Sequence, residues 1–220
     1  VVIGSGPGGY VAAIRAGQLG LKTALVERDP FLGGTCLHRG CIPTKALLEN
    51  AARYQDLLHA EDFGLKIQGD VEVDWGRVQS RKKGVVQQLA GGVKGLLRKQ
   101  KVEVVTGWGR IDGARRVAIH GDGPQGGVVR TLECRHIVIA TGSVPREIGS
   151  APFDGERILS SDHVLELDRI PATMVVVGAG AVGVEFASIY DHFGTEVTLV
   201  EALPRLLPIE DEEVSAELGK

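Results

Sequence analysis

The residues best suited to chemistry are two cysteines four positions apart, Cys36 and Cys41. A zinc site is disfavoured because structural zinc usually takes four Cys or His ligands, and only His38 lies nearby. A purely structural disulfide is disfavoured as well, because it would close a loop too short to contribute much stability. The whole chain of 220 residues has only 3 cysteines, which do not make a disulfide framework. The pair therefore favours redox chemistry.

The spacing of the two cysteines sets a geometric condition. Five residues of ideal helix rise about 7.5 Å, whereas a disulfide needs Cα atoms within about 6.8 Å of each other. The segment must depart from a regular helix, and Gly34 and Gly40 allow that. A bridge near a helix start, where the dipole favours thiolate, is suited to exchange. We predict a reducible Cys36–Cys41 disulfide and no metal site, with Cys134 as an inert packing residue in an apolar strand.

A glycine-rich turn near the start of the chain has the pattern of a dinucleotide site. Gly4-x-Gly6-x-x-Gly9 follows the apolar run Val1–Ile3, and a helical pattern and a strand ending at Glu27 come next. In such a turn the first glycine permits the bend, the second admits a pyrophosphate, and the third lets the helix pack on the strand. The N-terminus of the following helix favours the negative charge of the phosphate, and the carboxylate of Glu27 can accept a hydrogen bond from a ribose hydroxyl.

A second glycine-rich turn repeats this pattern later in the chain. Gly178-Ala179-Gly180-Ala181-Val182-Gly183 follows the strand Met174–Val177, and a helical pattern and the strand Glu196–Val200 lead to Glu201. A carboxylate at that position would repel a 2′-phosphate, so NAD is favoured over NADP. One such turn could be an ordinary Gly-rich turn, but two in the same register predict an α/β protein with two Rossmann-like dinucleotide-binding domains.

The elements between the two turns follow from periodicity. Helices are predicted at Thr44–His59 and Trp75–Gln100, the second with Val78, Val85, Leu89, Val93 and Leu96 on one side. Short strands are predicted at Val102–Thr106, Arg115–Ile119, Val128–Leu132 and His136–Ala140. Residues 146–172 have the character of a connection, so we predict one domain over 1–147 and the first part of another over 148–220. The second domain is expected to be cut short, in an acidic helical segment.

Composition and charge narrow the classes of function. The net charge of −3 gives no reason to expect nucleic acid or an anionic membrane as partner. No apolar run reaches the roughly 18 residues that span a bilayer, and no signal peptide is visible. We expect a cytoplasmic protein, or one of an organelle matrix in a eukaryote. Because Val1 opens inside a strand pattern, residues are expected to be missing in front of it.

The run from Gly33 to Lys45 resembles the redox signature of the pyridine nucleotide-disulfide oxidoreductases, which include dihydrolipoyl dehydrogenases, glutathione reductases and mercuric reductases. The resemblance covers the whole chain and implies an FAD-binding domain followed by an NAD-binding domain. Within the group the run is most similar to the lipoamide dehydrogenases, since the others tend to carry Val in place of Leu37 and Ile42. His38 departs from the Asn more usual there, which weakens the substrate assignment but affects neither cysteine.

The resemblance also implies roles for single residues. Cys36 would exchange with the substrate dithiol, and Cys41 would face the flavin and form its charge-transfer thiolate. Lys45 would lie near the flavin N5, paired with Glu185. The residues expected to bind FAD are Gly4, Gly6, Gly9, Glu27, Arg28, Gly33, Gly34, Thr35, Cys36, Lys45, Gly109, Thr141, Gly142 and Ser143. Those expected to bind NAD are Gly178, Gly180, Ala181, Val182, Gly183 and Glu201.

The activity implied is oxidation of dihydrolipoamide to lipoamide with hydride transfer through FAD to NAD. The substrate would be carried on a lipoyl domain of a 2-oxo acid dehydrogenase complex, and the full-length protein would be a homodimer. The alternatives are a glutathione- or mercury-type reductase, which mostly use NADPH, and a non-catalytic FAD-binding fragment. None of the 6 histidines matches the family's His-Glu base, so these residues alone are expected to be inactive.

Overall fold

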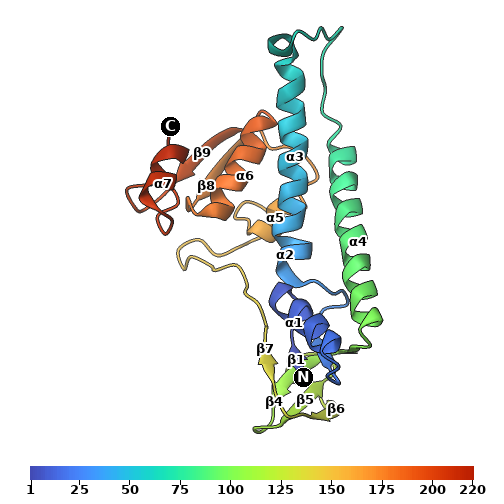
Figure 1. Ribbon diagram of the computed structural model, residues 1–220. Coiled ribbons are helices and arrows are strands. Elements are labelled where there is room, and N and C mark those ends of the chain that lie inside the picture. The colour runs from blue at the N-terminus through green and yellow to red at the C-terminus, as the bar shows by residue number, and fades with distance from the viewer. The chain divides into compact units, whose positions relative to one another are not determined.

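The computed structural model describes all 220 residues and divides them into two compact units. One unit consists of Val1–Ile42 and Gly84–Arg146, and the other of Pro43–Lys83 and Glu147–Lys220. Two long helices, α3 (Cys41–Leu58) and α4 (Trp75–Lys99), begin in one unit and end in the other (Figure 1). These units group segments by packing, whereas the boundary expected at residue 147 came from the connection-like composition of residues 146–172. The domain boundaries themselves stay a prediction.

The first unit is built on a parallel sheet of four strands in the order β3-β2-β1-β7. Its strands are β1 (Val2–Ile3), β2 (Ala24–Glu27), β3 (Glu103–Thr106) and β7 (Val138–Ile139). Every residue of β2 is buried, as expected for a short apolar strand inside a parallel sheet. Helix α1 (Pro7–Gln18) connects β1 to β2, so the first predicted β-α-β unit is confirmed.

A second sheet of this unit is antiparallel, with β5 in the centre. Its strands are β4 (Trp108–Ile111), β5 (Arg116–His120) and β6 (Val128–Glu133). The central residues of β5, Val117 to Ile119, are buried. The sequence analysis missed β4, because this strand of four residues includes Gly109 and Arg110, which do not alternate as a half-buried strand does.

The face that α4 buries differs in part from the predicted one. Val93 and Leu97 are buried in the core of the first unit, and Ala90 packs against it. Leu89 and Leu96, which were predicted to lie on the apolar side, are 43% and 48% exposed. Leu96 and Leu97 are adjacent and point about 100° apart around the helix axis, and here Leu97 faces the core whereas Leu96 lies at the exposed side. The burial follows the spacing of Ala90, Val93 and Leu97, of which the prediction included Val93 alone.

The second unit contains the second β-α-β arrangement. Strands β8 (Thr173–Val177) and β9 (Glu196–Val200) pair in parallel, and α6 (Ala181–His192) connects them, as predicted. The remaining elements are η1 (Ala60–Phe63), α2 (Gly34–Arg39) of the first unit, α5 (Ser161–Leu165) and α7 (Glu212–Leu218). The core of the second unit comprises Leu47, Ala51, Trp75, Leu165, Phe186, Ile189, Tyr190 and Phe193. No helix combines the length and apolar character needed to cross a membrane.

A buried lysine joins α4 to α5 inside the second unit. The side chain of Lys82 is 1% exposed, and its Nζ donates to the carbonyl oxygen of Leu165 and, at 2.7 Å, to Glu166 Oε1. Burial lowers the pKa of Lys82, and the Glu166 carboxylate opposes that shift. The other oxygen of Glu166 lies 3.3 Å from Nζ of Lys83, which is 60% exposed. Two adjacent lysines thus share one carboxylate from a buried and an exposed position.

This contrast predicts unequal effects of truncating the two lysines. Lys82→Ala should lower the free energy of unfolding by about 1–3 kcal/mol, because it empties a buried site and leaves the Leu165 carbonyl without its donor. Lys83→Ala is the control and should change it by no more than about 0.5 kcal/mol, as surface substitutions usually do. Urea denaturation measures both. Equal losses for the two variants would mean that Lys82 is not buried in solution.

Candidate functional site

The first glycine turn has two glycines that the fold requires and one that it does not. Gly4 has φ +98°, and a Cβ there would lie 2.1 Å from the Ala140 carbonyl oxygen. A Cβ on Gly9 would lie 1.8 Å from the carbonyl oxygen of Gly4. For Gly6, in contrast, the nearest atom would be Gly34 Cα at 3.9 Å, which is ordinary contact. Packing therefore does not explain Gly6, and the space beside it fits the close approach of a pyrophosphate.

The second glycine turn repeats this arrangement in the second unit. Gly178 has φ +104°, which favours glycine whatever the surrounding space. A Cβ on Gly183 would lie 1.9 Å from the carbonyl oxygen of Gly178, whereas a Cβ on Gly180 would meet no atom within 4 Å. The middle glycine again faces open space, so the same pyrophosphate geometry is available here.

Each turn leads into a helix whose N-terminus is open to an anion. Helix α1 starts after Gly6 and α6 after Gly180, and neither has a side-chain cap or an acidic residue in its first turn. The first N–H groups of a helix lack partners within it, and the helix dipole adds partial positive charge there. A bound phosphate would satisfy both conditions. The two turns and their helices therefore fit two dinucleotides.

The acid at the end of β2 is tied to the first glycine turn. Glu27 is buried, and its Oε2 accepts from the backbone N–H of Ser5 at 2.7 Å. Its Oε1 accepts from the backbone N–H of Asp29 at 2.9 Å. A carboxylate offers about four lone-pair sites, so two can still accept from a ribose hydroxyl pair. The backbone bonds hold the carboxylate in a fixed orientation beside the turn.

The acid at the end of β9 makes the equivalent bonds. Glu201 Oε2 accepts from the N–H of Ala179 at 2.7 Å, and its Oε1 accepts from the N–H of Leu203 at 3.0 Å. These amides, with Ala179 contributing most, hold the pKa of Glu201 below its usual range. Since that carboxyl stays ionised at neutral pH, it can accept hydrogen bonds there and repels a further anion.

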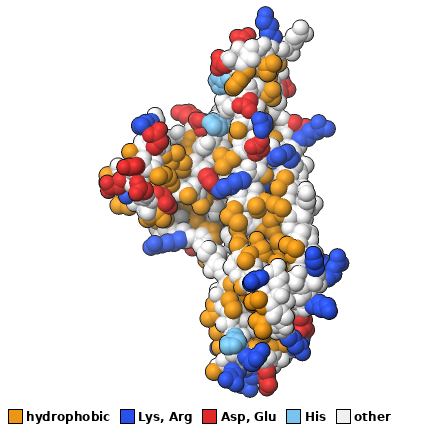
Figure 2. Space-filling view, viewed as in Figure 1, with side chains coloured by type: hydrophobic (Ala, Val, Ile, Leu, Met, Phe, Trp, Pro, Cys, Tyr) orange, Lys and Arg blue, Asp and Glu red, His pale blue; other side chains and the backbone are white.

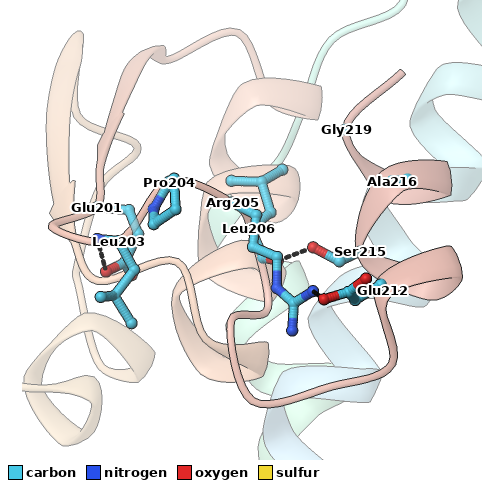
Figure 3. Close-up of a pocket in the computed structure, with 9 residues that line it drawn as sticks. All are labelled: Glu201, Leu203, Pro204, Arg205, Leu206, Glu212, Ser215, Ala216 and Gly219. Atoms are coloured by element: carbon cyan, nitrogen blue, oxygen red, sulfur yellow. Dashed lines mark hydrogen bonds and ion pairs between the residues drawn. The ribbon is translucent and has the colours of Figure 1, made fainter.

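The nearest arginine on the chain after Glu201 is engaged elsewhere. A shallow hollow of about 630 Å³ lies beside Glu201 (Figure 3), lined by Glu201, Leu203, Pro204, Arg205, Leu206, Glu212, Ser215, Ala216 and Gly219. Within it Arg205 Nη1 pairs with Glu212 Oε1 at 3.1 Å, and its Nη2 donates to the carbonyls of Pro208 and Glu210. Figure 2 shows acidic side chains gathered over this C-terminal region. Arg205 is therefore not presented to a 2′-phosphate.

The two cysteines form a disulfide where two helices meet. Cys36 lies in α2, and Cys41 begins α3, so the helix is interrupted at Gly40. The interruption brings the two Cα atoms to 4.6 Å, well below the distance in a continuous helix, as predicted. A Cβ on Gly40 would lie 3.2 Å from the Thr35 carbonyl oxygen, which is tighter than usual. Cys41 is an exposed residue and Cys36 a partly exposed one, so the bridge is not enclosed in the core.

The start of the disulfide helix is attached to the first glycine turn. The N–H of Gly33 donates to the carbonyl oxygen of Ser5 at 3.0 Å and to its hydroxyl oxygen at 3.1 Å. Gly34 has φ +61°, and a Cβ there would lie 2.5 Å from Gly6 Cα. Ser5 is fully buried, so water does not compete for these bonds. Sequence reasoning missed Ser5, although a hydroxyl residue inside a glycine turn was the available signal.

The residues after β7 contact the start of the disulfide helix. The Thr35 hydroxyl donates to the carbonyl oxygen of Ser143 at 3.4 Å. Gly142 has φ +76°, which turns the chain directly after Thr141. The structure thus brings the 141–143 segment to the start of α2, while its role toward a cofactor stays a prediction.

Two further candidates for FAD contact lie at the sheet of the first unit. The Arg28 guanidinium carbon is 4.8 Å from the centroid of the Trp108 ring, a cation–π arrangement. A Cβ on Gly109 would lie 3.0 Å from Ile3 and 3.2 Å from Val26, so glycine lets β4 approach β1 and β2. This packing explains Gly109 without a ligand, and its contact with FAD stays a prediction.

An ion pair of the second unit joins two residues expected near a flavin. Lys45 Nζ lies 2.5 Å from Glu185 Oε1, with side chains 59% and 29% exposed. Lys45 follows Cys41 by one turn of α3, so both lie on the same side of that helix. At this exposure the pair contributes little to stability. Its geometry orients the ammonium group, and the role of both residues at a flavin stays a prediction.

The third cysteine lies outside both cores. Cys134 follows β6 and is partly exposed, and its Sγ donates to the Arg115 carbonyl at 3.6 Å. The prediction of a packing residue within an apolar strand was therefore wrong. The strand β6 is exposed at most positions, so its apolar residues do not form a buried face that Cys134 could join.

The chain is similar over its whole length to known proteins of one family. A family model described as pyridine nucleotide-disulphide oxidoreductase matches residues 1–220. The chain is 44% identical to a dihydrolipoyl dehydrogenase of Bacillus subtilis, over 99% of the chain and 47% of that protein. It is 46% identical to a dihydrolipoyl dehydrogenase of Zymomonas mobilis, over 100% of the chain and 46% of that protein. The chain thus spans about half the length of these relatives.

Two solved structures superpose on nearly the whole chain. LpdA of Mycobacterium tuberculosis superposes with a TM-score of 0.86 at 29% identity, over 99% of this chain and 48% of the other. The HOCl-induced flavoprotein disulfide reductase RclA of Escherichia coli superposes with a TM-score of 0.77 at 27% identity, over 99% and 45%. Both similarities extend over nearly the whole chain, which includes the two glycine turns and the cysteine pair.

The contrast between the glycines of the first turn predicts separable effects. Gly6→Ala should change the free energy of unfolding of the flavin-free protein by no more than about 1 kcal/mol, because the added methyl group has room. The same substitution should weaken flavin binding at least about tenfold, because the methyl group blocks the pyrophosphate. Gly9→Ala is the comparison and should destabilise the flavin-free protein itself. Urea denaturation and flavin fluorescence titration measure the two effects. Undiminished flavin affinity in Gly6→Ala would contradict the assignment.

Proposed function

The chain belongs to the pyridine nucleotide-disulphide oxidoreductase family, and from this premise we propose that it is the FAD- and NAD-binding part of a dihydrolipoyl dehydrogenase. The observation that carries the proposal is the Cys36–Cys41 disulfide, whose helix start is hydrogen-bonded to the first glycine turn. This attachment brings the redox pair and a dinucleotide site into one unit. The names of the relatives at 44% and 46% identity support the substrate class.

The chemistry proposed for the cysteines is thiol–disulfide exchange. A thiolate of dihydrolipoamide attacks Cys36 Sγ, the Cys36–Cys41 bond breaks, and the electron pair leaves on Cys41. The second substrate thiol then attacks the mixed disulfide, which closes lipoamide and releases Cys36. Two electrons have passed from the substrate dithiol to the cysteine pair. Neither cysteine is buried, and the choice of Cys36 as the attacked one follows from the family resemblance.

The cofactors supply the remaining steps when bound. FAD supplies two-electron chemistry between the thiols and hydride transfer to a nicotinamide. In the first unit the N-terminus of α1 would hold its pyrophosphate and Glu27 its ribose, near the start of α2. Lys45, oriented by Glu185, would present a positive charge next to the flavin. These residues bind and orient, so their loss should reduce cofactor retention before it alters the exchange step.

The second cofactor is proposed to be NAD. In the second unit the N-terminus of α6 and Gly180 would receive its pyrophosphate, and Glu201 its adenine ribose. The ionised Glu201 disfavours a 2′-phosphate, and Arg205 is engaged with Glu212 and two carbonyls. This charge arrangement disfavours the glutathione- and mercury-type alternatives, which mostly use NADPH.

The setting of the activity is proposed from the same relatives. The substrate would be dihydrolipoamide on a lipoyl carrier domain of a 2-oxo acid dehydrogenase complex, and the full-length protein a cytoplasmic or organelle-matrix homodimer. Residues 1–147 would form the FAD-binding domain and 148–220 the first part of the NAD-binding domain. A base for the substrate thiol would come from outside these residues, because none of the 6 histidines matches the family's His-Glu base. General base assistance is typically worth about 10²–10⁴-fold in rate.

Anaerobic turnover of the full-length flavoprotein tests this function. Dihydrolipoamide should reduce NAD at a rate that Cys36→Ser abolishes, because the exchange needs the disulfide. Cys134→Ser is the matched control and should retain that rate, since Cys134 lies outside the redox pair. A retained rate in Cys36→Ser, or faster reduction of glutathione disulfide with NADPH, would contradict the proposal.

The charge at Glu201 predicts a change in cofactor preference. Glu201→Arg in the full-length enzyme should weaken NAD binding by roughly ten- to a hundredfold, as expected for a lost charged hydrogen bond. It should also improve tolerance of NADP, because the repulsion is removed. Glu196→Arg makes the same charge change at the exposed start of β9 and should leave the affinity for NAD and the tolerance of NADP unchanged. Steady-state KM values measure the effects, and an unchanged NAD affinity in Glu201→Arg would show that Glu201 binds no ribose.

A further inference from the structure

The segment between β2 and the disulfide helix is held by two side chains that lie between the cysteines. His38 Nε2 lies 2.8 Å from the carbonyl oxygen of Leu32, and the His38 ring stacks near Phe31 with centroids 4.1 Å apart. Arg39 Nη2 donates to Asp29 Oδ2 at 2.9 Å. Both side chains come from the last turn of α2. We call these contacts of His38 and Arg39 the α2 clamp.

The clamp closes a ring of hydrogen bonds around the first dinucleotide site. Asp29, which pairs with Arg39, donates its backbone N–H to Glu27 Oε1. Glu27 Oε2 accepts from Ser5, and Ser5 accepts from Gly33 at the start of α2. One end of α2 is therefore fixed through Ser5 and the other through Arg39. Both attachments lead to the carboxylate expected to bind ribose.

Helix α2 depends on such contacts for its position. It has 6 residues and ends at Gly40, and helices this short are not stable alone because nucleation is costly. In the oxidised protein the disulfide itself holds Cys36 beside Cys41. Once two electrons and two protons from a dithiol have converted the bridge to two thiols, that covalent restraint is gone. The bonds at the two ends of α2 then keep the thiols close together.

We propose that His38 and Arg39 are positioning residues that set the redox equilibrium of the Cys36–Cys41 pair. This inference rests on the proposed function, because it deepens the redox role of the same site. The clamp raises the effective concentration of one thiol with respect to the other and so favours the disulfide. Loss of the clamp makes the disulfide easier to reduce. It also loosens the segment after Glu27, on which the first dinucleotide site depends.

The size of the effect is limited by solvent. The side chains of Arg39 and Asp29 are 36% and 22% exposed, so their attraction is partly screened. We expect removal of one clamp contact to shift the dithiol–disulfide equilibrium about two- to tenfold toward the thiols. For a two-electron couple a tenfold shift corresponds to a rise in reduction potential of about 30 mV.

The test equilibrates the full-length holoprotein with mixtures of oxidised and reduced dithiothreitol, followed by alkylation and mass measurement of the Cys36–Cys41 peptide. Arg39→Ala and the milder Asp29→Asn should both shift the equilibrium toward thiols. The exchanged pair Asp29→Arg with Arg39→Asp should restore it, because the opposite charges meet again. His38→Ala should shift it, whereas His38→Gln can place an amide donor near the position of Nε2 and should shift it less.

Arg53→Ala is the matched control, since it removes an arginine from an exposed i,i+4 pair with Glu49 on α3 and should leave the equilibrium unchanged. If Arg39→Ala, Asp29→Asn and His38→Ala all match Arg53→Ala, the inference is overturned. The equilibrium with dithiothreitol is determined from the alkylated cysteines and requires neither nicotinamide nor lipoamide. A protein that shows the predicted shifts but fails to oxidise dihydrolipoamide would overturn the proposed substrate and leave the clamp supported.

Discussion

The backbone N–H of Gly33, shared between the carbonyl and hydroxyl oxygens of Ser5, is the contact on which the candidate site depends. Ser5 is fully buried inside the first glycine turn, so this bond forms without competition from water and is costly to leave unmade. It fixes the start of the disulfide helix against the turn that fits a pyrophosphate. Because Ser5 also donates its N–H to Glu27, one residue connects the glycine turn, the acid at the end of β2 and the disulfide helix of the first unit.

The two glycine turns show how a fold requirement can be separated from a ligand requirement. In each turn backbone conformation or close packing explains the first and third glycines, whereas the middle glycine faces open space. In each turn the following acid also bonds to the residue after the first glycine, Ser5 or Ala179. The same local solution therefore recurs in two units, and only the first carries a disulfide. That difference places the disulfide in the first unit, whereas the second unit has the glycine turn and the acid without a cysteine pair.

Much of this arrangement could be predicted from the sequence, because it depends on local pattern. The strands around both glycine turns, the helices α1 and α6, and the break between Cys36 and Cys41 all follow from periodicity and spacing. Contacts between distant segments could not be predicted in this way. The bond from Gly33 to Ser5, the burial of Leu97 rather than Leu96, and the exposure of Cys134 depend on which elements pack together. Strand β4 was missed because Gly109 serves close packing on β1 and β2, which leaves no alternating pattern.

The site as a whole depends on a reducible bridge between Cys36 and Cys41 beside the first glycine turn. Thiol counting on the unfolded protein, before and after treatment with a reductant, tests it most directly. We expect one free thiol before reduction, at Cys134, and two more after it, which alkylation and peptide mass mapping should assign to Cys36 and Cys41. Three free thiols before reduction, or a bridge that includes Cys134, would contradict it.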